Sequence, residues 1–252
     1  MLWENDVIYE EKEDIGIITL NRPEKRNALS KGMLSQLADI LYKIANERRV
    51  KVVIIKGTGK CFSSGHDLKE ILSSDLHDAE ETFDIIKRVM IAIREAPQPV
   101  IAQVHGYALA AGCQLVAACD LAVASEETKF ALSGINVGLF CFTPTVFVSR
   151  NIAPKRAFEL AFTGDMITAQ EALKWGLINK VVPREKLEEE TMALAKRLAR
   201  HSLSVLEAGK KFFYRQLDLS WEDALECATK TIILWSQRKE VKKGITAFLE
   251  KK

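Results

Sequence analysis

Short apolar runs and helical repeats of apolar residues alternate along the first 180 residues. The β-branched runs at 15–20 and 50–56 are too short for buried helices, so they predict buried strands. Residues 7–9 predict a first strand that pairs with 15–20 around a charged turn at 10–14. The same kind of pattern predicts further strands at 99–105, 121–124 and 178–182, and an extended segment at 130–138.

Helices are predicted where apolar residues recur every three or four positions. After Ser30, a common N-cap residue, the apolar residues between 33 and 44 follow this spacing. A second helix covers about 79–95 and ends before Pro97, which cannot continue it. A capping-box pattern opens a further helix at 168–176. Shorter helices are predicted at 66–70, 144–151 and 154–162.

The order of these elements predicts the α/β class with a helical end. Strands and helices alternate over most of the chain, and from residue 185 onward the pattern is helical only. The breaks between these last helices are predicted near His201, Ser220 and Gly244. We therefore expect two regions, a core at 1–200 and a helical region at 201–252, although no low-complexity linker marks a sharp boundary between them.

The stretch from Ala108 to Asp120 places small residues and the start of an apolar helix shortly after a strand. At such a turn several backbone N–H groups point toward one place, and the positive end of the helix dipole lies behind them. This arrangement suits a developing negative charge on an oxygen atom. The sequence therefore predicts an oxyanion site here and raises the question of which acid or base stands beside it.

Composition excludes several classes of partner. The 252 residues include 36 Lys and Arg against 34 Asp and Glu, so no overall field favours nucleic acid or an anionic membrane. The five cysteines form no C-x-x-C pair and no histidines have metal-ligand spacing, which indicates free thiols and no metal site. No apolar run approaches the roughly 20 residues of a membrane span. The acidic start lacks a signal or transit pattern, so we expect a cytoplasmic protein.

A family resemblance is carried by segments that keep their spacing along nearly the whole chain. The most specific are Ser-Ser-Gly-His-Asp-Leu-Lys-Glu at 63–70 and Ala-Ala-Gly-Cys-Gln at 110–114, supported by 21–29, 164–176 and 245–251. The pattern resembles the crotonase (enoyl-CoA hydratase/isomerase) superfamily. This resemblance implies a crotonase-like spiral of ββα units with a C-terminal helical trimerisation region, in a homotrimer or a dimer of trimers. It also implies an acyl-CoA thioester as ligand, with coenzyme A as part of the substrate and no separate cofactor.

The resemblance assigns the oxyanion site to two backbone N–H groups, those of His66 and Ala111. Only the amides are needed for this role, so the side chains are free to vary. Many family members have Gly at the position of Ala111. A methyl group is tolerated there only if the local φ is negative, because positive φ favours glycine.

Contacts to coenzyme A are implied at two segments of the sequence and at the C-terminal end. Arg22, Lys25 and Arg26 offer the charge-assisted donors that phosphates favour. Phe248 and Lys251 match family positions that reach the coenzyme A of a neighbouring subunit. The implied contact residues of the two segments are Lys25, Arg26, Ala28, Ser64, Gly65, Asp67 and Leu68.

The sequence departs from the hydratase pattern at both acid/base positions. Hydratases of this family use two glutamates, and the matching positions hold Gln114 and Gly134. Neither residue titrates near neutral pH, and each general acid or base is worth roughly 100- to 10,000-fold in rate. We therefore expect an enoyl-CoA hydratase/isomerase-like enzyme of fatty-acid metabolism in which most of the hydratase chemistry is lost. The alternative is a non-catalytic acyl-CoA-binding or modulatory protein.

Two side chains remain open as substitutes for the missing glutamates. His66 titrates near neutral pH by type, although its backbone is assigned to the oxyanion site. Cys141 has no activating group visible in the sequence, and a packed thiol is the favoured interpretation. Asp67 and Glu70 are expected to cap or pair within the short helix that they begin, and His105 is expected to be a structural histidine.

Overall fold

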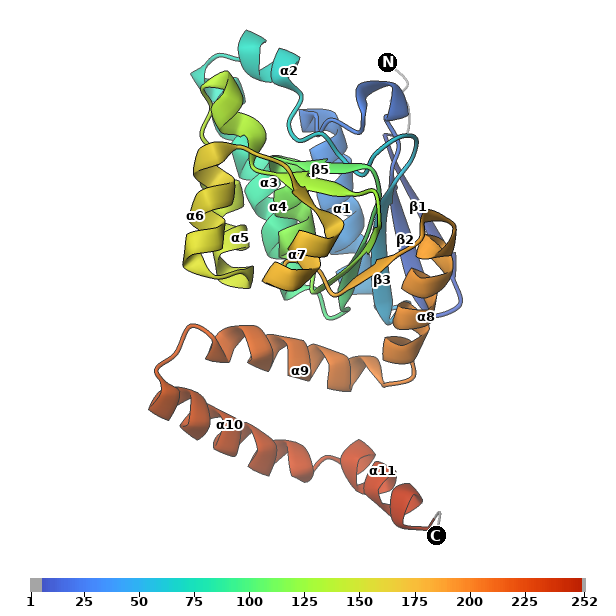
Figure 1. Cartoon of the computed structure of the whole chain (residues 1–252). Coiled ribbons are helices and arrows are strands. Elements are labelled where there is room, and N and C mark those ends of the chain that lie inside the picture. The colour runs from blue at the N-terminus through green and yellow to red at the C-terminus, as the bar shows by residue number, and fades with distance from the viewer. Residues whose placement is uncertain (1–5, 251–252) are drawn as a thin grey trace. The chain divides into compact units, whose positions relative to one another are not determined.

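The computed structural model describes residues 6–250 (Figure 1). Within this part, the chain divides into two compact units, one ending at Glu207 and the other beginning at Ala208. The division falls inside helix α9 (Leu203–Gln216). None of the helices described is both long and apolar enough to cross a bilayer.

The first unit is built on a largely parallel sheet. Its neighbouring strands run, in order, β1 (Val7–Lys12), β2 (Ile15–Leu20), β3 (Val52–Gly57), β4 (Val100–Val104), β6 (Leu121–Ser125) and β9 (Lys180–Val182). β1 pairs with β2 antiparallel, and the other pairs are parallel. The turn between β1 and β2 is tighter than expected, because Glu13 adopts a left-handed φ of 55° and the strand continues through Lys12.

Alternate residues of the central strands enter two different cores. On β3, Val53 and Ile55 belong to the larger core, whereas Val52 and Ile54 belong to the smaller one. Helices α1 (Lys31–Glu47) and α3 (Leu76–Glu95) pack together over the first core, and α8 (Leu187–Ala199) packs over the second. Burial on both faces explains why the run at 50–56 shows no polar alternation.

Several helix ends follow the predicted caps. The Ser30 side chain accepts a hydrogen bond from the Met33 N–H at the start of α1. Thr168 and Glu171 form the capping box of α7 (Ala169–Trp175), which ends at Gly176 with a φ of 90°. Helix α3 begins before the expected residue 79, because the Asp75 side chain caps it.

A small second sheet, which the sequence pattern did not predict, lies beside the first (Figure 1). It consists of β5 (Tyr107–Leu109), β7 (Lys129–Ala131) and β8 (Ile167–Thr168). The extended segment expected at 130–138 is wrong beyond Ala131, because residues 133–137 form a 3-10 helix. Strand β5 leads directly into α4 (Ala111–Ala118), so this sheet positions the small-residue stretch. Helices α5 (Phe142–Asn151) and α6 (Pro154–Thr163) follow.

The second unit contains the end of α9 together with α10 (Trp221–Ser236) and α11 (Lys239–Leu249). Ser220 caps α10 at the predicted break. The break predicted at Gly244 is wrong, since this residue lies inside α11. A glycine within a helix costs only about 1 kcal/mol relative to alanine, which a helix of this length tolerates.

Candidate active site

The loop at 61–67 is hydrogen-bonded on one side to the basic loop at 21–29. The Ser64 N–H donates to the Arg26 carbonyl over 3.0 Å, and the Leu29 N–H donates to the Gly65 carbonyl over 2.8 Å. The Asp67 N–H in turn donates to the Leu29 carbonyl over 3.3 Å. Two segments about 35 residues apart in the sequence therefore form one continuous surface.

The backbone N–H of His66 faces away from the basic loop. Leu29 and His66 form a parallel β-bridge, in which Leu29 uses the carbonyl of Gly65 and the N–H of Asp67. In a parallel bridge the residue between these two groups points its own N–H to the opposite side. The His66 amide is thus directed toward the start of α4.

Strand β5 holds the other side of the same loop. The Ser63 N–H donates to the Tyr107 carbonyl over 3.1 Å, and the Leu109 N–H donates to the Ser63 carbonyl over 3.0 Å. The chain then turns at Ala110, whose φ of 47° and ψ of −114° precede the first residue of α4. Such a backbone conformation costs on the order of 1–3 kcal/mol for a residue with a Cβ.

The amides of His66 and Ala111 lie close together. An ideal Cβ added to Gly65, whose φ is 95°, would lie 3.4 Å from the Ala111 nitrogen and 2.9 Å from the Leu109 oxygen. Among residues 6–250, neither the His66 N–H nor the Ala111 N–H donates to a backbone or side-chain acceptor. Ala111 itself is helical and has no positive φ, so its methyl group is compatible with the local backbone.

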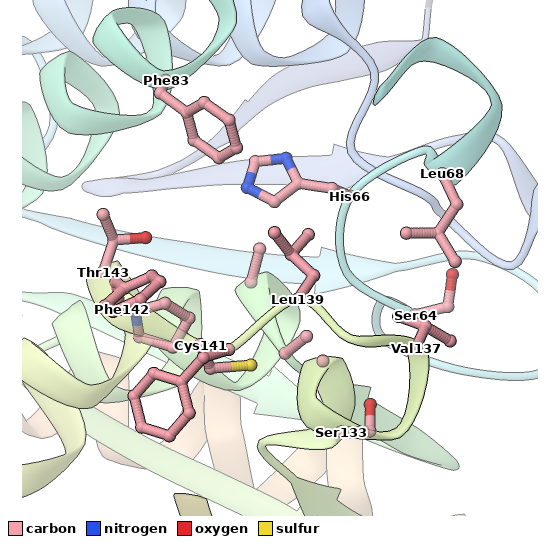
Figure 2. Close-up of a pocket in the computed structure, with 15 residues that line it drawn as sticks. Ser64, His66, Leu68, Phe83, Ser133, Val137, Leu139, Cys141, Phe142 and Thr143 are labelled. Atoms are coloured by element: carbon pink, nitrogen blue, oxygen red, sulfur yellow. The ribbon is translucent and has the colours of Figure 1, made fainter. Parts of the chain in front are cut away.

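A cavity of about 400 Å³ opens beside these two amides (Figure 2). Its volume lies in the range of small-ligand sites. The polar side chains of its wall are those of Ser64, His66, Ser133 and Thr143, and no Asp, Glu, Lys or Arg of the described chain lines it. The apolar part of the wall comes from Leu68, Phe83, Val137, Leu139, Phe140, Phe142 and Pro144, together with the thiol of Cys141.

The His66 ring points across the top of this cavity toward Phe83 (Figure 2). The two rings make an edge contact, with centroids 5.3 Å apart and planes at 71°. Both ring nitrogens are buried and have no hydrogen-bond partner among the described residues. Burial removes water from the charged imidazolium and lowers the pKa of His66 to about 4. The Leu29 backbone opposes this pKa shift by a smaller amount, and its approach to the ring falls short of hydrogen-bond geometry.

Gln114 stands behind the cavity wall. Its side chain is 1% exposed, and its Oε1 accepts a hydrogen bond from the Thr143 hydroxyl over 3.2 Å. Thr143 lines the cavity, whereas Gln114 does not. At the position that the resemblance assigns to the first glutamate, the side chain that lines the cavity is therefore the hydroxyl of Thr143 and not residue 114 itself.

Gly134, the position that the resemblance assigns to the second glutamate, is closed off by the backbone. An ideal Cβ on Gly134 would lie 2.2 Å from the Leu139 carbonyl oxygen and 2.9 Å from the Cys141 sulfur. The first of these distances is far below any van der Waals contact. The segment at 139–141 thus occupies the space that a side chain at residue 134 would need.

The two thiols near this segment are protonated at neutral pH. Burial raises the pKa of Cys141, and the Gly134 backbone opposes this only partly. Burial also raises the pKa of Cys113 to about 12. A reactive cysteine needs a lowered pKa. The structure therefore supports the interpretation of both as packed thiols.

The basic side chains of the loop at 21–29 have two different environments. Arg22 donates to the Ala28 carbonyl over 2.9 Å and pairs with Asp67 at 3.4 Å, so it is part of the local structure and does not offer a free charge as expected. Lys25 and Arg26 are exposed beside it. The Asp67 side chain also caps α2 (Leu68–Ser73), as predicted.

The other residues singled out from the sequence lie away from the cavity wall or outside the described residues. Phe248 is on α11 in the second unit and is 78% exposed, while Lys251 lies outside the described residues. His105 is a buried structural histidine, as predicted, and its Nε2 contacts the Gly59 carbonyl at 3.0 Å. Glu70 accepts from the Lys31 N–H over 2.8 Å at the start of α1, so the expectation that it pairs within its own short helix is wrong.

Comparison with known proteins decides the family. The model of the enoyl-CoA hydratase/isomerase family matches residues 10–252. The chain belongs to this crotonase family. Solved crotonase structures share its fold over almost the whole chain, including the C-terminal helices. Enoyl-CoA hydratase from Mycobacterium smegmatis has a TM-score of 0.95 and 41% identity, covering 99% of this chain and 98% of that one.

One group within the crotonase family is particularly similar. Enoyl-CoA hydratase domain-containing protein 3 from Rattus norvegicus is 47% identical over 244 residues, which covers 96% of this chain and 81% of the rat protein. The human protein of this name has a crystal structure with a TM-score of 0.94 and 44% identity, covering 98% of each chain. The 2,3-dehydroadipyl-CoA hydratase of Escherichia coli is 32% identical, covering 98% of this chain and 97% of the bacterial protein.

The expected cytoplasmic location is wrong by the same comparison. The similar proteins from rat, mouse and human are all named as mitochondrial. Targeting segments are read by receptors and removed from mature proteins, so the composition of a folded domain carries no such address.

Several cavity residues were not singled out from the sequence. Phe83 could have been suspected, because it continues the apolar stripe of α3 that includes Ile86 and Met90. Val137 and Phe142 carry no comparable signal, since they lie at the end of a short 3-10 helix and at the first residue of α5. Ala110 was missed because an alanine gives no sign of a positive φ.

Proposed function

We propose that this crotonase-family protein binds acyl-CoA thioesters and stabilises a negative thioester oxygen with the backbone N–H groups of His66 and Ala111. The observation that carries the proposal is the proximity of these two unpartnered amides at an apolar cavity. The dipole of α4 adds to the field at this place. Removing one donor from such a site typically costs about 100- to 1,000-fold in rate.

The coenzyme A moiety is assigned to the surface made by the two joined loops. Lys25 and Arg26 supply positive charge for its phosphates, and the segments at Ala28 and 64–68 supply backbone and side-chain contacts. Phe248 and Lys251 are assigned to the coenzyme A of a neighbouring subunit. The proposal needs neither a metal ion nor a separate cofactor.

The reaction that we propose is a thioester reaction of fatty-acid metabolism other than hydration. Hydration needs groups that activate water, and the two family positions hold a buried Gln114 and a closed Gly134. A direct test compares crotonyl-CoA hydration by this protein and by the E. coli relative under the same conditions. We expect less than about one thousandth of the bacterial rate from the loss of two acid/base groups. A rate within about tenfold would refute the argument from these two positions.

A second candidate function is a non-catalytic acyl-CoA-binding or modulatory role. It is favoured by the absence of any carboxylate or charged amine from the described cavity wall, which leaves only neutral groups beside the oxyanion site. Calorimetry with butyryl-CoA, followed by a turnover screen over saturated, unsaturated and branched thioesters, separates the two candidates. Binding with no turnover supports this role, and turnover of any thioester supports an enzyme.

A variant of the loop tests the oxyanion assignment itself. Gly65→Ala adds a methyl group 2.9 Å from the Leu109 oxygen at a positive φ, so the His66 peptide must shift. We expect butyryl-CoA affinity to fall by about tenfold or more, the value of one lost hydrogen bond to a charged or polarised group. Gly209→Ala, an exposed helical position with open space around it, is the matched control. Equal affinity of both variants would contradict the assignment.

We also propose a homotrimer or a dimer of trimers, assembled through the C-terminal helices. Large apolar side chains on α10 and α11 are exposed in the single chain, among them Trp221, Ile232, Ile233, Leu234, Ile245 and Phe248. Apolar surface of this kind is typical of an assembly interface. Sedimentation analysis tests the proposal, and a monomer at micromolar concentration would contradict it.

A further inference from the structure

The His66 ring stands in the wall between two cavities. One is the cavity of about 400 Å³ beside the oxyanion amides, and the other is a small space of about 10 Å³, enough for roughly one water molecule. Of the described residues, only His66 and Phe83 line both. The small cavity is also lined by Leu29, Asp67, Glu70 and Thr82.

The hydrogen-bonding capacity of this ring is unmet within the protein. Both nitrogens are buried, and no described residue is a partner for either. Buried polar atoms in native proteins are nearly always paired with protein or ordered water, so an unpaired one in the wall of a ligand cavity calls for a partner from outside the chain. A neutral imidazole brings one donor and one acceptor. A half-turn of the ring about the Cβ–Cγ bond exchanges a carbon edge for a nitrogen edge without moving its plane.

The surroundings of the ring determine which ligand group fits. A ligand carboxylate is disfavoured, because the described cavity wall has no cation to pair with it and is mostly apolar. On the other side, Leu29 lines the small cavity, and its backbone raises the pKa of the ring as an acceptor of the ring N–H does, so the ring N–H is directed to that side. The nitrogen on the acyl side is then an acceptor. An acceptor needs a donor from the ligand, and the neutral donor with a compatible size is a hydroxyl group.

We propose that the His66 imidazole accepts a hydrogen bond from a hydroxyl group on the acyl chain, so that the site selects hydroxyacyl-CoA thioesters over unsubstituted ones. This inference rests on the proposed oxyanion site, because the His66 amide and the His66 ring must serve the same ligand. Since both groups belong to one residue, the hydroxyl lies within a few bonds of the thioester carbonyl. His66 is then a specificity residue through its side chain, in addition to its backbone role.

The test measures binding of butyryl-CoA and of 2-, 3- and 4-hydroxybutyryl-CoA by calorimetry on the full chain. We expect at least one hydroxylated thioester to bind about tenfold or more tightly than butyryl-CoA, since it satisfies a buried group. His66→Phe keeps the backbone N–H and removes the ring acceptor. The affinities of this variant for butyryl-CoA and for the hydroxylated thioesters should differ from one another by less than about threefold, so the hydroxyl preference is lost. His66→Leu repeats the measurement if the larger ring lowers the melting temperature.

His77→Phe is the matched control, because it makes the same change at an exposed position in the first turn of α3. It should keep both affinities and the preference. Equal binding of all four thioesters by the wild type overturns the inference and leaves the oxyanion proposal intact. A preference that survives in both His66 variants also overturns it. If the protein binds none of the four thioesters, the proposed function itself is contradicted.

Discussion

His66 should make the protein sensitive to acid, and the size of the effect follows from its burial. The pKa of the ring is about 4 in the folded protein, against an ordinary value of about 6.5. As pH falls through 6.5 the unfolded imidazole gains a proton, whereas the folded one stays neutral until about pH 4. Titration of His66 therefore leaves the free energy of unfolding unchanged above about pH 6.5 and lowers it progressively as pH falls toward 4.

The loss can be estimated from the difference between these two pKa values. The complete difference of about 2.5 units corresponds to about 3 kcal/mol, and roughly 2 kcal/mol of it is lost between about pH 7.5 and about pH 5. His66→Phe has no proton to gain, so its free energy of unfolding should fall by that much less over the same interval. The burial-lowered pKa of His105 acts equally in both proteins and cancels in the comparison.

Urea unfolding at the two pH values, at one protein concentration, measures this difference. The exposed His77→Phe variant serves as the control and should follow the wild type. At neutral pH, His66→Phe should also be at least as stable as the wild type, because it removes two buried polar atoms that lack partners. A wild type and a His66→Phe variant with the same pH dependence would refute the argument that the ring is buried and neutral.

Three further predictions concern substitutions in and beside the cavity wall. Ala110→Gly should raise the free energy of unfolding by about 1 kcal/mol, because it relieves the strain at a φ of 47°. Ala111→Gly, in the adjacent helical turn, should lower the free energy of unfolding by up to about 1 kcal/mol. Denaturant unfolding checks both variants. Gly134→Ala should cost roughly 1–3 kcal/mol through its clash with the Leu139 carbonyl, while Gly209→Ala should stabilise α9 by about 0.5–1 kcal/mol in the same assay. Gln114→Glu should leave the rate of crotonyl-CoA hydration within about tenfold of the wild type, because the side chain is buried behind Thr143 and one carboxylate does not restore a pair of acid/base groups. A gain above about 100-fold would show that the side chain at residue 114 reaches the cavity.

Much of the fold could be predicted where local chemistry determines it. The strand at 15–20 and the caps at Ser30 and Thr168 depend on residues within a few positions of one another, and the structure has all of them. Strands β5 and β8 were missed, because two or three residues carry no measurable period and their pairing partners lie far away in the sequence. Gly244 shows the opposite error, in which a strong local signal was outweighed by the rest of its helix.

The site was predictable in its location more than in its shape. The small-residue stretch and the family resemblance single out His66 and Ala111, and the structure has both residues in the wall of one cavity. The closure at Gly134 depends on the course of the backbone at 139–141, to which the sequence offers no guide. The unpartnered ring of His66 is likewise a consequence of three-dimensional burial.

The central claim is that the His66 and Ala111 amides hold the thioester oxygen of an acyl-CoA. A crystal structure of the protein with butyryl-CoA tests it most directly. The account predicts the thioester oxygen within about 2.7–3.1 Å of both backbone nitrogens, with the acyl chain in the cavity lined by Phe83, Leu139 and Phe142. A thioester bound with its oxygen away from these two amides, or an acyl chain outside this cavity, would contradict it.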